Sequence, residues 1–278
     1  MLTPVMTLIV FVFIGGLSMG LAQSFGYFPA IGLREVSLKY YMMVFSNPEF
    51  KSALTFSLYT SFVSSVLSVL VGLLLAYLLL KSGVSDRLSS MLYRLPIVVP
   101  HAIAALLIYT LFAQSGVLSR LLYLFGFITE SSQMPVLLFD RTGKGVMLAY
   151  VWKATPFIAM VVFDILKSVT NRLEEAAFNL GASEWQVFRY VILPLIAPTL
   201  LANFIIIFAF SFGAFEIPYL LGPTAPKALP ILSYIEYTNP DLSHRPYTMA
   251  INMVLTGVSL FIVGLTSFVF KPLLKYKD

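Results

Sequence analysis

Long apolar runs with few or no charged residues constrain this chain more than any other feature of its sequence. A helix needs about 20 apolar residues to cross the hydrocarbon of a bilayer, where the backbone must satisfy its own hydrogen bonds. Runs of that kind fall in Val5–Ala22, Ser52–Leu80, Leu95–Gln114, Gly145–Val169, Leu195–Leu221 and Tyr247–Phe270. The sequence therefore predicts an all-α polytopic membrane protein with six transmembrane helices, organised as a single transmembrane domain over residues 1–278.

Composition supports a membrane location. The chain is 59% hydrophobic and only 11% charged, whereas soluble domains carry about 25% charged residues. A soluble fold of this length cannot cover that much apolar surface. No Lys or Arg precedes the first run, so we expect a retained helix rather than a cleaved signal peptide. The net charge of +5 is modest and spread along the chain, which gives no indication of nucleic-acid binding.

Motifs for catalysis or cofactor binding are missing from the sequence. The chain has no cysteine, which excludes disulfides and thiolate metal sites. The nearest approach to a phosphate-binding loop is Gly143-Lys144, but position 138 is Leu where that loop needs glycine. Metal-ligand spacings are also absent, and an intramembrane hydrolase would need paired acids or a Ser–His pair. We predict no catalytic residue, metal or cofactor, and hence no enzyme.

Small residues recur on the second apolar run at intervals of three or four. Such a stripe lets two helices approach closely in lipid, where packing drives their association. We interpret it as a helix-packing surface, made of Ser61, Ser65, Ser68, Gly72 and Ala76.

The connection between the fourth and fifth runs has a regular pattern. It predicts two short helices with a break at Gly181, whose missing side chain permits a positive φ. Asn171 would cap the first helix, with Glu174 three residues later. Ser183 would cap the second, before Pro194 opens the next span. Ala176 and Ala177 leave a flat surface beside the carboxylates of Glu174 and Glu175, which a basic groove of another protein could pair.

This connection resembles the signature of binding-protein-dependent ABC import permeases. The match consists of Glu175-Ala176-Ala177, then Gly181, then Ile192 and Pro194. The resemblance implies a type I importer (MetI-like) core over about 55–270, with a coupling loop at 168–194 that faces the cytoplasm. It also implies that both termini are cytoplasmic. The residues expected to couple the chain to an ATPase are Glu174, Glu175, Ala176, Ala177, Gly181, Ser183 and Pro194.

The resemblance also implies partners and a mechanism. The chain would be the permease subunit of an ABC importer in the inner (cytoplasmic) membrane, surrounded by the lipid bilayer. It would need two cassette ATPase subunits, a second identical or homologous permease, and a soluble substrate-binding protein. Softer similarities, such as Leu95-Pro96 and Leu229-Pro230, resemble the subgroup for polyamines, ferric iron, thiamine and phosphonates. The alternative from another class is a secondary transporter or channel driven by ion gradients, which would not need the coupling loop.

Ionisable residues at membrane depth are candidates for a substrate path. Glu216 shares a predicted helical face with Phe208, Phe212, Phe215 and Tyr219, so it could hold a cation with help from aromatic rings. Glu216 could instead pair structurally with Lys153. Lys153 could contact an anionic group, and His101 could be either a path residue or a packed, hydrogen-bonded side chain. These alternatives stay open from the sequence.

Overall fold

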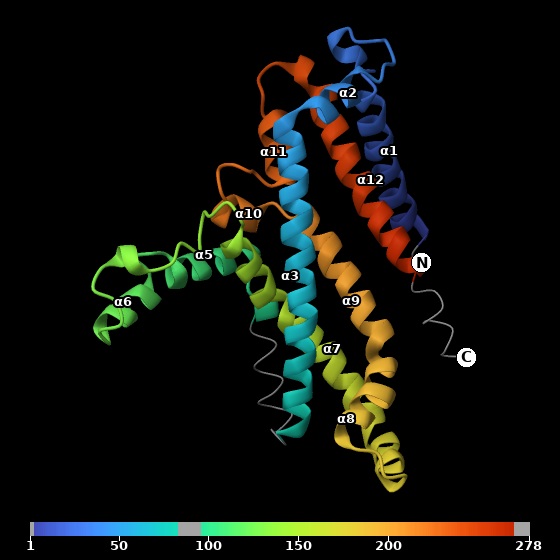
Figure 1. The fold of residues 1–278 in the computed structure, drawn as a ribbon. Coiled ribbons are helices and arrows are strands. Elements are labelled where there is room, and N and C mark those ends of the chain that lie inside the picture. Colours follow the sequence, from blue (N-terminus) through green and yellow to red (C-terminus); the bar gives the residue numbers. More distant parts are fainter. Residues whose placement is uncertain (1–2, 83–95, 270–278) are drawn as a thin grey trace. The chain divides into compact units, whose positions relative to one another are not determined.

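The computed structural model describes residues 3–82 and 96–269, without the side chains of 168–172, 267 and 269. Both chain ends, predicted to be cytoplasmic, fall outside these residues in part. The described chain is helical, and its only strand-like feature is an isolated bridge between Phe28 and Leu33. Within the described residues, six helical segments (Figure 1) are long and apolar enough to cross a membrane, which confirms the predicted class. They are Thr3–Ser24, Pro48–Lys81, His101–Leu124, Lys144–Lys167, Glu184–Gly213 and Leu242–Thr266.

The chain divides into two compact units, and two of the three boundaries between them fall inside helices. Unit 1 comprises Met1–Ser57 and Pro226–Phe261, and unit 2 comprises Leu58–Ala225 and Ile262–Asp278. The prediction of a single transmembrane domain stays a prediction.

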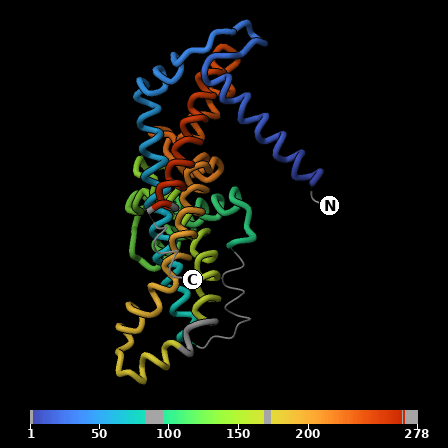
Figure 2. The backbone as a smooth tube through the Cα atoms, turned by 90° about the vertical axis from the view of Figure 1, so that its right-hand side faces the viewer, coloured from blue at the N-terminus to red at the C-terminus, as the bar shows by residue number. Residues whose placement is uncertain are grey.

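Unit 1 is held together by polar contacts near the ends of its helices. Its elements are α1 (Thr3–Ser24), η1 (Pro29–Ile31), α2 (Lys39–Ser46), the start of α3 (Pro48–Lys81), α11 (Leu229–Tyr237), η4 (Leu242–His244) and most of α12 (Arg245–Val269). Asn47 donates to the Tyr247 hydroxyl at 2.8 Å, and Lys227 pairs with Glu49 at 2.7 Å. The C-terminal end of α1 lies close to α12, and the N-terminal part of α1 runs away from α12 (Figure 2). The side chains of that N-terminal part are exposed.

Unit 2 carries the predicted coupling loop and the candidate path residues. Its elements are the rest of α3, α5 (His101–Phe112), α6 (Val117–Leu124), η2 (Ser131–Gln133), α7 (Lys144–Asn179), α8 (Glu184–Val187), the π-helical η3 (Phe188–Ile192), α9 (Leu193–Gly213), α10 (Glu216–Leu221) and the end of α12. α5 and α6 run across the direction of α3 in Figure 1. One core cluster joins α3, α7, η3 and α9, and a second joins α5, α7 and α10.

The predicted small-residue stripe does bring two helices together. A Cβ built on Gly72 of α3 would lie 2.7 Å from Ile158 Cβ and 3.1 Å from the Thr155 carbonyl oxygen on α7. The first distance is shorter than real Cβ contacts allow, and the second is tighter than most of them. The close approach of α3 and α7 therefore requires glycine at position 72.

Candidate functional site

The predicted coupling loop is the tip of a helical hairpin, which we call the coupling segment (Glu174–Pro194). The sequence predicted two separate short helices in this segment, and the prediction of the first one is wrong. α7 continues without a break from Lys144 to Asn179, so Asn171 lies inside a helix rather than at its start. Nothing between Pro156 and Gly181 interrupts the backbone hydrogen bonds of α7, and a capping residue cannot start a helix where those bonds continue. The side chain of Asn171 is outside the described part of the chain.

A tight reversal at Gly181 ends α7. Gly181 has φ 84°, in the left-handed region. Its N–H donates to the Phe178 carbonyl at 2.9 Å, and the Ala182 N–H donates to the Ala177 carbonyl at 3.1 Å. These two bonds form the Schellman motif, which satisfies carbonyls that a helix end leaves unpaired. A Cβ on Gly181 would meet nothing within 4 Å. Conformation, and not lack of space, therefore makes glycine the preferred residue here.

Ser183 starts the next helix as predicted. Its hydroxyl accepts from the Gln186 N–H at 3.4 Å, and the Gln186 side chain accepts from the Ser183 N–H at 2.8 Å. This reciprocal pair is a capping box. α8, η3 and α9 then follow one another directly. The π-helical turn η3 comes just before Pro194, whose missing N–H leaves the Tyr190 carbonyl without its helical donor.

The tip of the coupling segment presents large apolar side chains to solvent. Leu180 is 89% exposed and Tyr190 70%. Leu180, Gln186 and Tyr190 border a hollow of about 340 Å³ beside the Gly181 turn. Large exposed apolar patches in folded proteins mark sites of interaction. The tip therefore has the character of a protein-docking surface.

The other side of the coupling segment is fixed to the membrane helices. Val187, Ile192 and Ile196 are buried in the core cluster of α3, α7 and α9, together with Ile158 and Leu166. Because interiors are close-packed, a displacement of the tip must move the helices to which it is packed.

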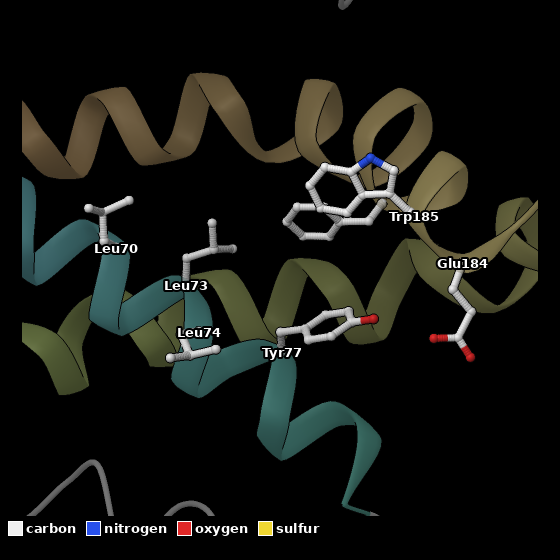
Figure 3. Close-up of a pocket in the computed structure, with 7 residues that line it drawn as sticks. Leu70, Leu73, Leu74, Tyr77, Glu184 and Trp185 are labelled. Atoms are coloured by element: carbon white, nitrogen blue, oxygen red, sulfur yellow. The ribbon is translucent and has the colours of Figure 1, made fainter.

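An ion pair and packed aromatic rings join the end of α3 to the α8–η3 turn. Figure 3 shows Tyr77, Glu184 and Trp185 of this contact. The Lys81 ammonium lies 2.6 Å from a Glu184 carboxylate oxygen. Beside this pair, Tyr77 packs edge-on against Phe188 at a ring distance of 5.6 Å, and Trp185 stacks on Phe188 at 5.8 Å. Sequence reasoning missed this contact. Tyr77 and Lys81 lie one turn apart at the end of an apolar run, which is the available signal for an interfacial anchor.

The two acidic residues of the motif lie in different surroundings. Glu175 is exposed, whereas Glu174 is half-buried. Burial raises the pKa of the Glu174 carboxyl above its ordinary value; the nearby Lys81 opposes this and Glu184 adds to it. Glu175 is therefore the more accessible charge for a partner, and Glu174 belongs to the charged group around Lys81 and Glu184.

The structure places His101, Lys153 and Glu216 within electrostatic reach of one another. The Lys153 ammonium donates to the carbonyl of Pro96 at 3.2 Å and to that of Val99. Residue 100 is a proline, so the Pro96 carbonyl has no helical donor and Lys153 replaces it. In the described part of the chain, no ion pair joins Lys153 to Glu216. His101 packs against Phe210, with ring centroids 4.9 Å apart.

The aromatic stripe predicted around Glu216 does not form one helical face. α9 ends at Gly213, Ala214 is extended, and α10 begins at Glu216. The break comes four residues before Pro218, whose ring clashes with a helical carbonyl at that distance. Phe208 and Phe212 are buried, while Phe215 stacks on Tyr219 beside the exposed Glu216. Glu216, Phe215 and Tyr219 thus form a group without Phe212.

Among the described residues there is no group of three or more His, Cys, Asp or Glu side chains that could hold a metal ion.

Comparisons with solved structures give the fold a context. The chain is similar to a chain of a bacterial alginate ABC transporter, solved with an alginate-bound periplasmic protein, with a TM-score of 0.74. The two are 19% identical, and the match covers 97% of this chain and 93% of the other. A chain of the inward-facing methionine transporter MetNI matches with a TM-score of 0.58 at 17% identity, over 80% of this chain and 94% of that one.

Sequence comparisons identify relatives and a family. The sulfate transport system permease protein CysT of Escherichia coli (strain K12) is 29% identical over 83% of this chain and 80% of its own length. CysT of Synechocystis is 24% identical, over 82% of this chain and 77% of its own. The family described as binding-protein-dependent transport system inner membrane component matches residues 68–274. The chain therefore belongs to this family, the membrane permease subunits of ATP-binding-cassette importers.

Proposed function

We propose that the chain forms one half of an importer's translocation pathway and that its coupling segment receives the movement of a cassette ATPase. The observation that carries this proposal is the two-sided construction of the segment. Leu180 and Tyr190 are exposed at the tip, and Val187, Ile192 and Ile196 are buried against α3, α7 and α9. A rigid element with one free face and one packed face can transmit displacement between two bodies.

The partners of the proposed importer are two cassette ATPases, a second permease and a soluble binding protein. The family description names a binding-protein-dependent system, and the similar alginate transporter was solved with its periplasmic protein. In this arrangement the coupling segment and the adjacent end of α3 face the cytoplasm. Both chain ends then lie on the cytoplasmic side of the membrane. Phe139 lies on the outer side, where its backbone N–H donates to the Leu221 carbonyl at 3.0 Å.

Two substitutions with matched controls test the coupling role. Gly181→Val strains a left-handed turn by about 1 kcal/mol or more, and Glu175→Lys reverses an exposed charge. Gly126→Val is the control for strain, because Gly126 has φ 75° and open surroundings outside the coupling segment. Glu130→Lys is the control for charge, since Glu130 is also exposed.

We expect both coupling variants to reach the membrane normally but to lose uptake or co-purified ATPase, while both controls keep them. Uptake into cells and ATPase bound to the purified permease are the measurements. Normal values of both for Gly181→Val and Glu175→Lys would contradict the coupling role.

For the cargo, we propose a sulfate-like oxyanion. The relatives named as sulfate permeases support this class over the polyamine-like subgroup that the short proline motifs suggested. The test is uptake of labelled sulfate and of labelled spermidine by a strain that carries the whole importer and lacks its own sulfate uptake. Sulfate uptake that needs this chain supports the proposal, and spermidine uptake without sulfate uptake contradicts it.

A further inference from the structure

A second hollow lies on the other side of α8 from the exposed tip. It is a groove of about 470 Å³ between α3 and the α8–η3 turn. Figure 3 shows three leucines in line along α3, with Tyr77 and Trp185 beyond them toward the helix end. We call it the α3–α8 groove, and its lining is Leu70, Leu73, Leu74, Tyr77, Glu184, Trp185 and Phe188.

The groove has the dimensions and polarity of a site for hydrocarbon. Leu70 and Leu74 are each 57% exposed, although they belong to a helix that crosses the membrane. Leu70 to Tyr77 spans about 10 Å along the helix axis, two helical turns. Tyr77 and Trp185 stand at the end of this stretch, and such aromatic side chains favour the depth of lipid headgroups. An extended acyl chain beside the leucines therefore has its headgroup near Lys81.

Charges of both signs border the groove at that end. Lys81 and Glu184 form an ion pair at 2.6 Å, yet their side chains remain 49% and 73% exposed. Glu174 is close enough to interact with both charges. A headgroup that carries only negative charge would meet two carboxylates here. A headgroup that carries a phosphate and an ammonium complements Lys81 and Glu184 at the same time.

We propose that the α3–α8 groove binds a phospholipid with an aminoethyl headgroup, phosphatidylethanolamine, with its acyl chain on the leucines, its phosphate on Lys81 and its ammonium on Glu184. The proposal rests on the membrane location of the family and not on the cargo or on the coupling role. A loop of a protein partner fits this groove less well. The backbone amides of such a loop would find no hydrogen-bond partners among leucines and aromatic rings. The exposed tip with its separate hollow is the better surface for a protein.

Photo-cross-linking tests the proposal on the whole importer. The assembled complex is placed in lipid nanodiscs that contain phosphatidylethanolamine with a diazirine in its acyl chain, and labelled peptides are identified after illumination. We expect labelling of the peptides with Leu70–Tyr77 and Trp185 to saturate and to exceed that of α1, whose exposed face samples bulk lipid. Unlabelled phosphatidylethanolamine should compete better than phosphatidylglycerol by about threefold, since exposed ion pairs are weak.

Variants separate a specific site from general lipid contact. Leu73→Trp fills the groove and should abolish the excess labelling. Leu78→Trp is the matched control, because Leu78 is exposed on the same helix but does not line the groove. Lys81→Ala and Glu184→Gln should keep acyl-chain labelling and lose the preference between headgroups. Co-purified ATPase checks that each variant assembles.

Three results would overturn the proposal: labelling of the groove no stronger than that of α1, equal labelling of Leu73→Trp and wild type, or no labelling because the cassette ATPase covers the groove. None of these readouts depends on transport, so the proposal can fail while the coupling role stands, and the reverse also holds.

Discussion

Lys153 illustrates what the sequence can and cannot reveal about the partners of a single residue. Its position in an apolar run indicates that it must find partners, because an isolated charge in lipid is strongly unfavourable. The sequence offered Glu216 as the partner, whereas the structure gives two backbone carbonyls. The relevant signal is the spacing of Pro96 and Pro100, which leaves a carbonyl without a helical donor. Residue types alone do not show which helix brings a donor to it.

Lys153→Met should therefore weaken assembly, because it leaves two partly buried carbonyls without a donor. Each unsatisfied group costs at most about 1–3 kcal/mol. Lys153→Gln keeps a donor and should retain part of the stability. Thermal unfolding of the purified permease complex is the measurement. Rescue of Lys153→Met by Glu216→Gln would show that the lost interaction is an ion pair with Glu216 and would contradict the carbonyl role.

Glu216→Gln distinguishes classes of cargo. With a sulfate-like cargo we expect uptake to be retained or increased, because a carboxylate repels an anion and the substitution removes that repulsion. Basal ATPase of the complex is the control for assembly. A loss of uptake with normal assembly would instead support a cationic cargo held by Glu216, Phe215 and Tyr219.

At the scale of elements, predictions from local signals held better than predictions from periodicity. The cap at Ser183 and the turn at Gly181 were predicted correctly, because caps and left-handed turns depend on residues only a few positions apart. The stripe through Phe208 and Phe212 assumed a straight helix, and the break before Pro218 divided it. The predicted helix start at Asn171 was wrong because the sequence has a good capping residue at a position where the helix continues. Lys81 and Glu184 meet across about a hundred positions, which no local pattern encodes.

The contact between α3 and α7 gives a prediction for element packing. Gly72→Ala places a methyl group 2.7 Å from Ile158 Cβ, so α3 and α7 must move apart. We expect this to lower the free energy of unfolding by about 1–3 kcal/mol. Gly257→Ala in α12 is the control, because its Cβ would meet nothing within 4 Å. Thermal unfolding should show a loss of stability for Gly72→Ala and none for Gly257→Ala. Equal stability of the two glycine variants would contradict the close approach.

For the whole molecule, the number of apolar helices and the family were predictable from sequence, since both follow from residues within single segments. The cargo was not, because one chain supplies only half of the proposed pathway and the residues that select the cargo can lie on its partner. Short proline motifs pointed toward polyamines, whereas the full-length relatives favour sulfate.

The chain by itself should not hydrolyse ATP. It has no phosphate-binding loop at Gly143-Lys144, and the described connection in the coupling segment is only a short turn. Purified permease titrated with ATP should release no phosphate above background, and addition of its cassette ATPase should restore turnover. Saturable hydrolysis that persists after removal of every cassette protein would contradict this expectation.

The unbroken course of α7 has a mechanical consequence. Pro156 lies inside this helix, and a proline removes one backbone bond, so it is the natural point for flexing. From Pro156 the helix extends about 35 Å to Asn179 and about 18 Å to Lys144 at 1.5 Å per residue. A given change of direction at Pro156 therefore displaces the Asn179 end about twice as far as the same change displaces the Lys144 end.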